Sequence, residues 1–167
     1  MAFWIEVRWP MITGDRLDLL YFHKGQYHRA QQMCEGDEVL YYEALKRDRA
    51  PKCECSECSR RTECAKLRGS QTIFAHVIVQ GKLERRPTEE VRTCGGYKFD
   101  RMRRVEVVLP KNENMERPGV KLPRVREVIG NRPMFGMQIP EDEFRRLAAE
   151  LKQAVERAAG ADTSCPQ

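Results

Sequence analysis

The sequence predicts a single α+β domain that is interrupted by one cysteine-rich insertion. Its 167 residues are enough to bury one core. Residues 39–42 and 72–79 are rich in β-branched and aromatic side chains, which predicts two strands that pair as a hairpin. Residues 144–155 place apolar side chains at helical spacing, which predicts an amphipathic C-terminal helix. We therefore expect one layered core built from both strands and helices.

The first strand is predicted over residues 3–9, where apolar side chains alternate with polar ones until Pro10 ends the pattern. Glu6 and Arg8 fall on the polar face of this strand. Trp4 falls there too, and it either lines a pocket or packs under a neighbouring helix.

Two helical pieces are expected after the first strand. Leu17, Leu20 and Tyr21 recur at helical spacing behind a possible N-cap at Asp15, which predicts a short helix. A second piece over residues 27–33 leads to a Gly-Asp turn and then to the central strand of the sheet.

The second half of the chain continues with a long strand over residues 99–109, which begins with basic side chains. Residues 122–130 predict a short helix, because a proline stands in its first turn and a glycine at its end. A last strand is expected at 135–139, and acidic residues after Pro140 begin the terminal helix at its positive end.

The domain is expected to span residues 1–160, with the insertion at 46–70 and a flexible tail at 161–167. The insertion carries a net charge of +4, which is most of the +5 of the whole chain. A pI near 8.9 permits a polyanionic partner without requiring one. No apolar run approaches the length of a spanning helix, and charged residues come too early for a signal peptide, so we expect a cytoplasmic protein.

The insertion holds four of the seven cysteines, at positions that predict one metal site: Cys53, Cys55, Cys58 and Cys64. In a reducing compartment such a cluster indicates metal binding more than disulfides. Zinc suits four thiolates in a tetrahedral site, and its binding can order a polar loop that has no core. An iron-sulfur cluster also takes four cysteines, and disulfides or free thiols remain alternatives.

The order of these segments resembles a known family. The motifs are the strand that ends at Pro10, M-x-x-G-D over 33–37, VLYY, IFAHVIV, RRVEVVLP, the helix LPRVREVIG and the closing MFGMQIPEDEFRRLAAEL. Together they resemble the EVE domain, a relative of the YTH and ASCH domains in the PUA-like superfamily. The resemblance covers residues 1–44 and 71–157 and does not include the cysteine insertion.

The resemblance implies a small curved β-barrel flanked by helices that binds DNA or RNA and receives a flipped, modified base in an aromatic pocket. An extruded base offers two faces for stacking and one edge for hydrogen bonds. The candidates for the base pocket are Trp4, Trp9, His23, Lys24, Tyr27 and Tyr42. The candidates for phosphate contacts are Arg29, Arg60, Arg61, Lys66, Arg68, Arg101, Arg103 and Arg104.

Two other classes of function compete with this prediction. The first is an iron-sulfur enzyme component, although the sequence contains no nucleotide-binding glycine motif, metalloprotease motif or nucleophile elbow. A metal held by four thiolates also has no position open for catalysis. The second is a protein-interaction module that docks through the metal-bound loop.

Overall fold

The computed structural model describes most of the chain, namely residues 1–8, 17–44, 69–88, 91–94, 97–109, 118–132 and 136–161. Within these ranges no helix is both long enough and apolar enough to cross a membrane. The predicted insertion falls largely on residues 45–68, which lie outside the described residues.

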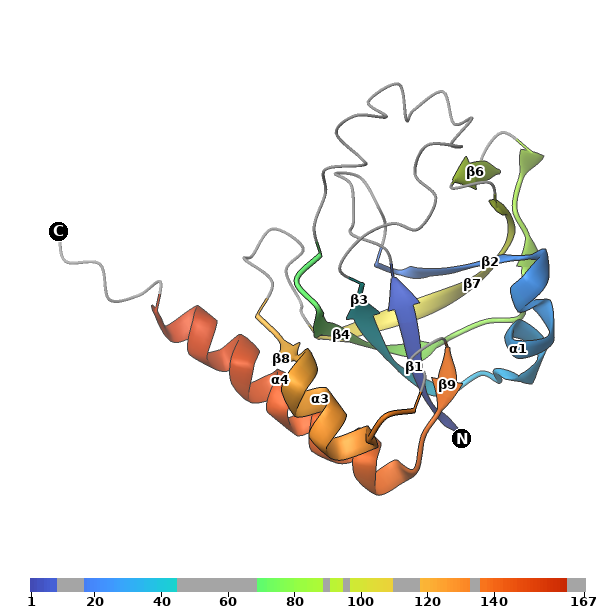
Figure 1. Cartoon of the computed structure of the whole chain (residues 1–167). Helices are drawn as coiled ribbons and strands as arrows, with labels where there is room; N and C mark the ends of the chain where they lie inside the picture. The colour runs from blue at the N-terminus through green and yellow to red at the C-terminus, as the bar shows by residue number, and fades with distance from the viewer. Residues whose placement is uncertain are drawn as a thin grey trace, which may run out of the picture.

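The strands form one mixed, strongly curled sheet (Figure 1). Six of them follow the order β2-β7-β4-β3-β1-β9, in which β1 and β3 are parallel and the other neighbours are antiparallel. Three short strands join this path, with β5 and β6 on β7 and β8 on β4. The bounds are β1 Phe3–Arg8, β2 Leu19–His23, β3 Glu38–Glu43, β4 Thr72–Val79, β5 Glu84–Arg85, β6 Arg92–Cys94, β7 Tyr97–Leu109, β8 Val120–Lys121 and β9 Met137–Gln138.

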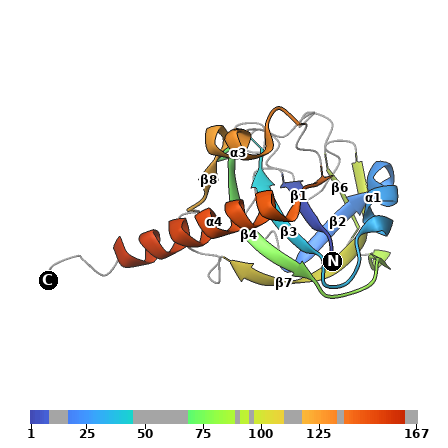
Figure 2. The same cartoon turned by 90° about the horizontal axis from the view of Figure 1, so that it is seen from below.

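Three α-helices accompany the sheet in the described residues, and two of them lie together on one of its faces (Figures 1 and 2). The short α1 (Tyr27–Gln32) follows a 3-10 turn, η1 (Lys24–Gln26), beside the curled end of the sheet. The helices α3 (Leu122–Ile129) and α4 (Glu141–Ala161) pack on the opposite side. Three acidic residues in the first turn of α4 complement the positive end of its dipole.

The sheet is covered on both faces, so it has two apolar cores. Phe3 and Ile5 of β1 point toward α4, where they share one core with Phe144 and Leu147 of that helix. Trp4, between them, points into the curl of the sheet. Because side chains alternate along a strand, Glu6 and Arg8 follow Trp4 toward the inside of the curl and not toward solvent.

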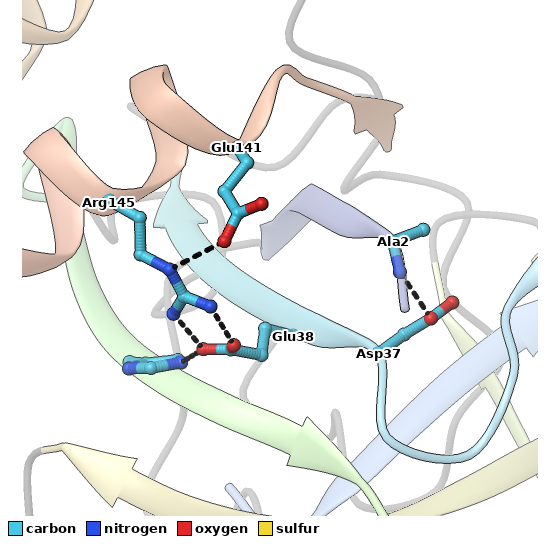
Figure 3. A network of polar contacts seen from close by, with 6 residues as sticks. Ala2, Asp37, Glu38, Glu141 and Arg145 are labelled. Carbon is cyan, nitrogen blue, oxygen red and sulfur yellow. Dashed lines mark hydrogen bonds and ion pairs between the residues drawn. The ribbon is translucent and has the colours of Figure 1, made fainter.

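The Gly-Asp turn before β3 fixes the start of β1. Gly36 has a φ of +86°, a conformation that favours glycine. The Asp37 carboxylate accepts a hydrogen bond from the Ala2 amide at 2.6 Å (Figure 3), and it also accepts from the Cys34 amide at 2.9 Å and the Trp4 indole at 3.1 Å. One carboxylate therefore ties the turn, the first strand and the core tryptophan together.

The structure confirms the α+β class and corrects one predicted element. Strands are present where 39–42, 72–79 and 99–109 predicted them, and β3 pairs antiparallel with β4. The helix predicted around Leu20 is wrong, because Leu19–His23 forms strand β2 and pairs with β7. Leu19, Leu20 and Phe22 of this short segment are buried, and an apolar run of that kind satisfies the helical and the strand pattern equally well.

Candidate functional site

Two aromatic candidates for a base pocket are core residues. Trp4 is 4% exposed and its indole donates to Asp37, so neither ring face is open for stacking. Tyr42 is 5% exposed and lies in the core beneath α3 and α4, on the face away from the curl. The prediction that these two side chains line a pocket is corrected, because the sheet buries both faces of the strands that carry them.

Three other candidates lie together along the connection from β2 to α1. The His23 ring accepts from the Gly25 amide and meets Phe99 edge to face, with centroids 5.5 Å apart. The Tyr27 hydroxyl donates to Asp100. The Arg101 guanidinium lies over the Tyr27 ring, 5.6 Å from the ring centroid. Lys24 is exposed between them. Both His23 and Tyr27 are half-buried and already contact β7.

The predicted phosphate contacts divide by exposure. Arg104 is exposed and Arg101 half-exposed on β7, where they remain accessible to a polyanion. Arg103 is buried, and its guanidinium donates to the carbonyls of Ala30 and Gly81, so its assignment to phosphate is corrected to a structural one. Trp9, the cations Arg60, Arg61, Lys66 and Arg68, and the cysteines Cys53, Cys55, Cys58 and Cys64 lie outside the described residues.

A group of charged and aromatic side chains meets near the end of β1, inside the curl. The Glu6 carboxylate is 4% exposed, and its Oε1 atom accepts from Arg29 Nη2 of α1 at 2.9 Å. Its Oε2 atom is buried and has no hydrogen-bond partner among the residues that the structure describes. We call Glu6 and its neighbours Arg8, Tyr21, Arg29 and Tyr41 the Glu6 cluster.

Guanidinium groups and tyrosine rings alternate in this region. The Arg8 guanidinium lies 4.8 Å from the ring centroid of Tyr41 and 5.8 Å from that of Tyr21. A second guanidinium, that of Arg86, lies 4.4 Å from the ring centroid of Tyr21. Arg8 Nη1 also donates to the Leu19 carbonyl at 2.9 Å, which links β1 to β2. Planar cations on aromatic faces are stabilised by the ring quadrupole, so these contacts hold the side chains in fixed orientations.

A glycine allows Arg29 to reach Glu6. Gly136, just before β9, has a φ of +54°, and a Cβ atom at this position would lie 2.0 Å from Arg29 Cζ. The backbone therefore passes directly against the guanidinium and confines it beside β1. A larger residue at position 136 would have to displace Arg29 from the carboxylate.

The environment of Glu6 favours its protonated form. Burial raises the pKa of Glu6 to about 7, although the positive charges of Arg29 and Arg8 oppose this shift. Burial also raises the pKa of Tyr41, whose hydroxyl donates to the Leu17 carbonyl at 3.3 Å. The site thus contains a carboxyl group that changes charge near neutral pH and has an oxygen available to accept a hydrogen bond.

Glu6 and Arg8 are not among the predicted site residues, because alternation along β1 indicates only that they share its polar face. One sequence feature could have identified them. Charged residues are rarely buried unless paired, so Glu6 within a strongly apolar strand calls for a partner such as Arg29. That partner lies 23 residues further along the chain.

Comparisons with known proteins support the fold alone. A scan against protein-family models gave no match, and neither did a search of curated proteins. Among solved structures, the NMR structure of Rpa0253 from Rhodopseudomonas palustris aligns with 92% of this chain and 94% of its own, with a TM-score of 0.50 and 10% identity. This match supports a small curled half-barrel, in agreement with the six-strand mixed sheet described above.

Proposed function

We propose that this protein binds nucleic acid and receives an extruded base, in the manner expected of the EVE branch of the PUA-like superfamily. One observation carries the proposal: a buried carboxylate oxygen with unmet hydrogen-bonding capacity lies beside arginine and tyrosine side chains. A base taken out of the stack needs hydrogen bonds for its edge and flat groups for its faces. In the Glu6 cluster, Glu6 supplies the acceptor and the half-buried Arg8, Tyr21 and Arg29 supply flat groups, whereas Tyr41 is fully buried.

The location of the cluster also supports this proposal. Glu6 is paired with Tyr41 in the β1–β3 register, and Arg29 comes from α1. These are the first strand, the helical connection and the central strand, which also carry the sequence-predicted candidates Trp4, Tyr27 and Tyr42. The residues differ from the predicted ones, since Glu6, Arg8 and Tyr21 take the place of Trp4 and Tyr42.

Contacts to the phosphate backbone are assigned to exposed cations near this end of the sheet. Arg101, Arg104 and Lys98 belong to β7, which pairs with β2 next to α1. The basic insertion would add further cations, and the net charge of +5 favours a polyanion. Such contacts are independent of base identity. They weaken at high salt, because the counterions that binding releases from the nucleic acid then gain less entropy.

The four cysteines of the insertion are proposed to hold one structural zinc ion. The donor set of four thiolates fits a closed tetrahedral site, in which the metal orders a loop and takes no part in a reaction. Elemental analysis of protein purified without chelator is expected to give about one zinc per chain. Iron with a brown colour would indicate an iron-sulfur cluster instead.

A binding titration tests the proposed function. Single-stranded and double-stranded DNA and RNA, with and without N6-methyladenine or 5-methylcytosine, are titrated with the protein at low and high salt and followed by fluorescence anisotropy. We expect saturable binding whose affinity falls steeply with salt and is strongest for one base. Absence of saturable binding to every oligonucleotide at low salt would reject the proposal.

A further inference from the structure

The two oxygens of the Glu6 carboxylate have different partners. Oε1 is held by Arg29 Nη2, whereas Oε2 is buried and has no hydrogen-bond partner among the described residues. An ionised carboxylate can accept about four hydrogen bonds, and a buried acceptor that lacks a partner is unfavourable. The fold therefore keeps this oxygen in place although nothing in the described part of the chain bonds to it.

The neighbouring donors with an assigned hydrogen bond are directed elsewhere, and the buried Arg29 Nε does not bond to Oε2 either. The Tyr41 hydroxyl donates to the Leu17 carbonyl, and Arg8 Nη1 donates to the Leu19 carbonyl. Gly136 confines the Arg29 guanidinium next to β1, where it serves Oε1. An additional donor for Oε2 is therefore best supplied by a molecule that enters the site.

We propose that Glu6 determines which bases the site accepts, and that Oε2 accepts an N–H from the hydrogen-bonding edge of the extruded base. This inference rests on the proposed function. The ligand class is then a base that keeps at least one N–H at this edge, as adenine, cytosine and their monomethylated amino forms do. A base whose amino group is dimethylated or deleted leaves Oε2 without a donor.

A series of related bases tests the inference with the wild-type protein alone. Oligonucleotides carry adenine, N6-methyladenine, N6,N6-dimethyladenine or purine, or cytosine beside 2-pyrimidinone, at one central position. A hydrogen bond to a charged group is strong enough that each donor-deleted base should bind about ten- to a hundredfold more weakly than its parent in the series that the site accepts. Equal affinity for parent and donor-deleted bases in both series would overturn the inference.

Glu6→Gln is expected to reverse the preference. The variant is nearly isosteric, and the amide oxygen should stay toward Arg29 because that guanidinium can only donate. The amide NH2 then occupies the position of Oε2 and meets the base with a donor. Purine should bind the variant at least as tightly as adenine, whereas unchanged discrimination would overturn the assignment.

Glu38→Gln is the matched control. Glu38 is also a buried carboxylate of this sheet, but it lies on the helix-covered face and its two oxygens are bonded to Arg145. This variant should keep the wild-type ratio of adenine to purine affinity. Thermal unfolding of both variants establishes that they are folded. If Glu6→Gln does not fold, equal affinity of the wild-type protein for parent and donor-deleted bases still overturns the inference.

The pH dependence of binding gives a second readout. Oε2 accepts best when Glu6 is ionised, and burial raises the pKa of Glu6 to about 7. The charged and titratable groups that face it are Arg8 from β1, Arg29 from α1 and Tyr41 from β3. Wild-type affinity for the preferred base should therefore rise between about pH 6 and pH 8, and Glu6→Gln should lack this rise.

The results separate the two levels of the proposal. Salt-sensitive binding without any dependence on the N–H donor would keep the proposed function and reject the role of Glu6. Failure of the wild-type protein to bind every oligonucleotide would reject both.

Discussion

Two buried carboxylates on opposite faces of the same sheet have contrasting surroundings. Glu38 opens β3 on the face covered by α4, and Arg145 bonds to its two oxygens at 2.8 and 2.9 Å (Figure 3). His76 bonds to the same group at 2.7 Å. Glu6 lies inside the curl on neighbouring β1, with one oxygen bonded to Arg29 and the other without a described partner.

The difference distinguishes a structural charge from a candidate site. A buried ion pair is stable only if further hydrogen bonds satisfy its remaining lone pairs. Glu38 meets this condition, because Arg145 bonds to both of its oxygens and His76 bonds to one of them. Arg145 also lies over the rings of Phe3 and Phe144, so this network fastens α4 to the sheet. The surroundings of Glu6 are incomplete although the cluster is equally enclosed, which is the pattern expected where a ligand completes the bonding.

The largest effect should appear in the pH dependence of stability. Burial raises the pKa of Glu6 from 4.5 to about 7, so the folded protein holds a proton that the unfolded chain releases. This contribution to stability is fully present below pH 4.5 and is lost as pH rises to about 7. Relative to wild type, Glu6→Gln should gain up to about 3 kcal/mol of unfolding free energy across this window.

Denaturant unfolding at several pH values measures this difference. His76 titrates with the opposite sign, because burial lowers its pKa and its contribution is lost as pH falls below its ordinary range. Since His76 is present in both proteins, its effect cancels in the comparison. Parallel stability curves for wild type and Glu6→Gln would show that Glu6 remains ionised in the folded protein.

Removing the partner of Glu38 should have the next largest effect. Arg145→Ala leaves a buried carboxylate with His76 as its remaining described partner. Loss of one partner of a fully buried pair costs about 3 to 5 kcal/mol, and we expect about 2 kcal/mol here because the Arg145 side chain is 45% exposed. Thermal unfolding should show the loss, while base selectivity should stay unchanged. A selective loss of base binding would mean that the two faces are coupled.

The two faces also differ in how far the sequence predicts them. The helix-covered face follows from local patterns, since the stripe Phe144, Leu147 and Leu151 is recognisable without tertiary information. The predicted helices at 122–130 and from 140 onward correspond to α3 and α4. Alternation also placed Phe3 and Ile5 correctly on one side of β1.

The inside of the curl could not be predicted in the same way. The alternation of side chains shows which residues share a side of a strand. It does not show that the sheet curls so far that its inner side is also closed off from water. Alternation therefore predicts a polar face for Trp4 and Glu6, and β2 was mistaken for a helix because its apolar side chains Leu19, Leu20 and Phe22 fit both patterns. The Glu6 pair depends on Arg29 and Gly136, which only the folded topology brings together.

A pair of glycine substitutions examines how the Glu6 cluster is held. Gly136→Ala and Gly130→Ala each place a side chain at a positive φ, and this backbone strain alone should cost each variant about 1 to 2 kcal/mol. A Cβ at Gly136 meets Arg29, whereas one at Gly130 meets nothing within 4 Å. Only Gly136→Ala should therefore weaken the preference for N–H-bearing bases in the anisotropy assay. Equal binding by the two variants would show that Arg29 can move without affecting the site.

The smallest effect is expected for an ion pair whose geometry resembles that of Glu38 but which is exposed. Arg124 of α3 donates through Nε and Nη2 to Glu150 of α4 at 2.9 and 2.6 Å. The two arginines are equally exposed, but the Glu150 side chain is 27% exposed against 9% for Glu38, so water and salt already screen its charge in the folded protein. Arg124→Ala should leave the thermal midpoint close to that of wild type, far above that of Arg145→Ala. If the two variants lost equal stability, contact geometry and not burial would determine what these carboxylates contribute, and the distinction drawn between Glu38 and Glu6 would lose its physical basis.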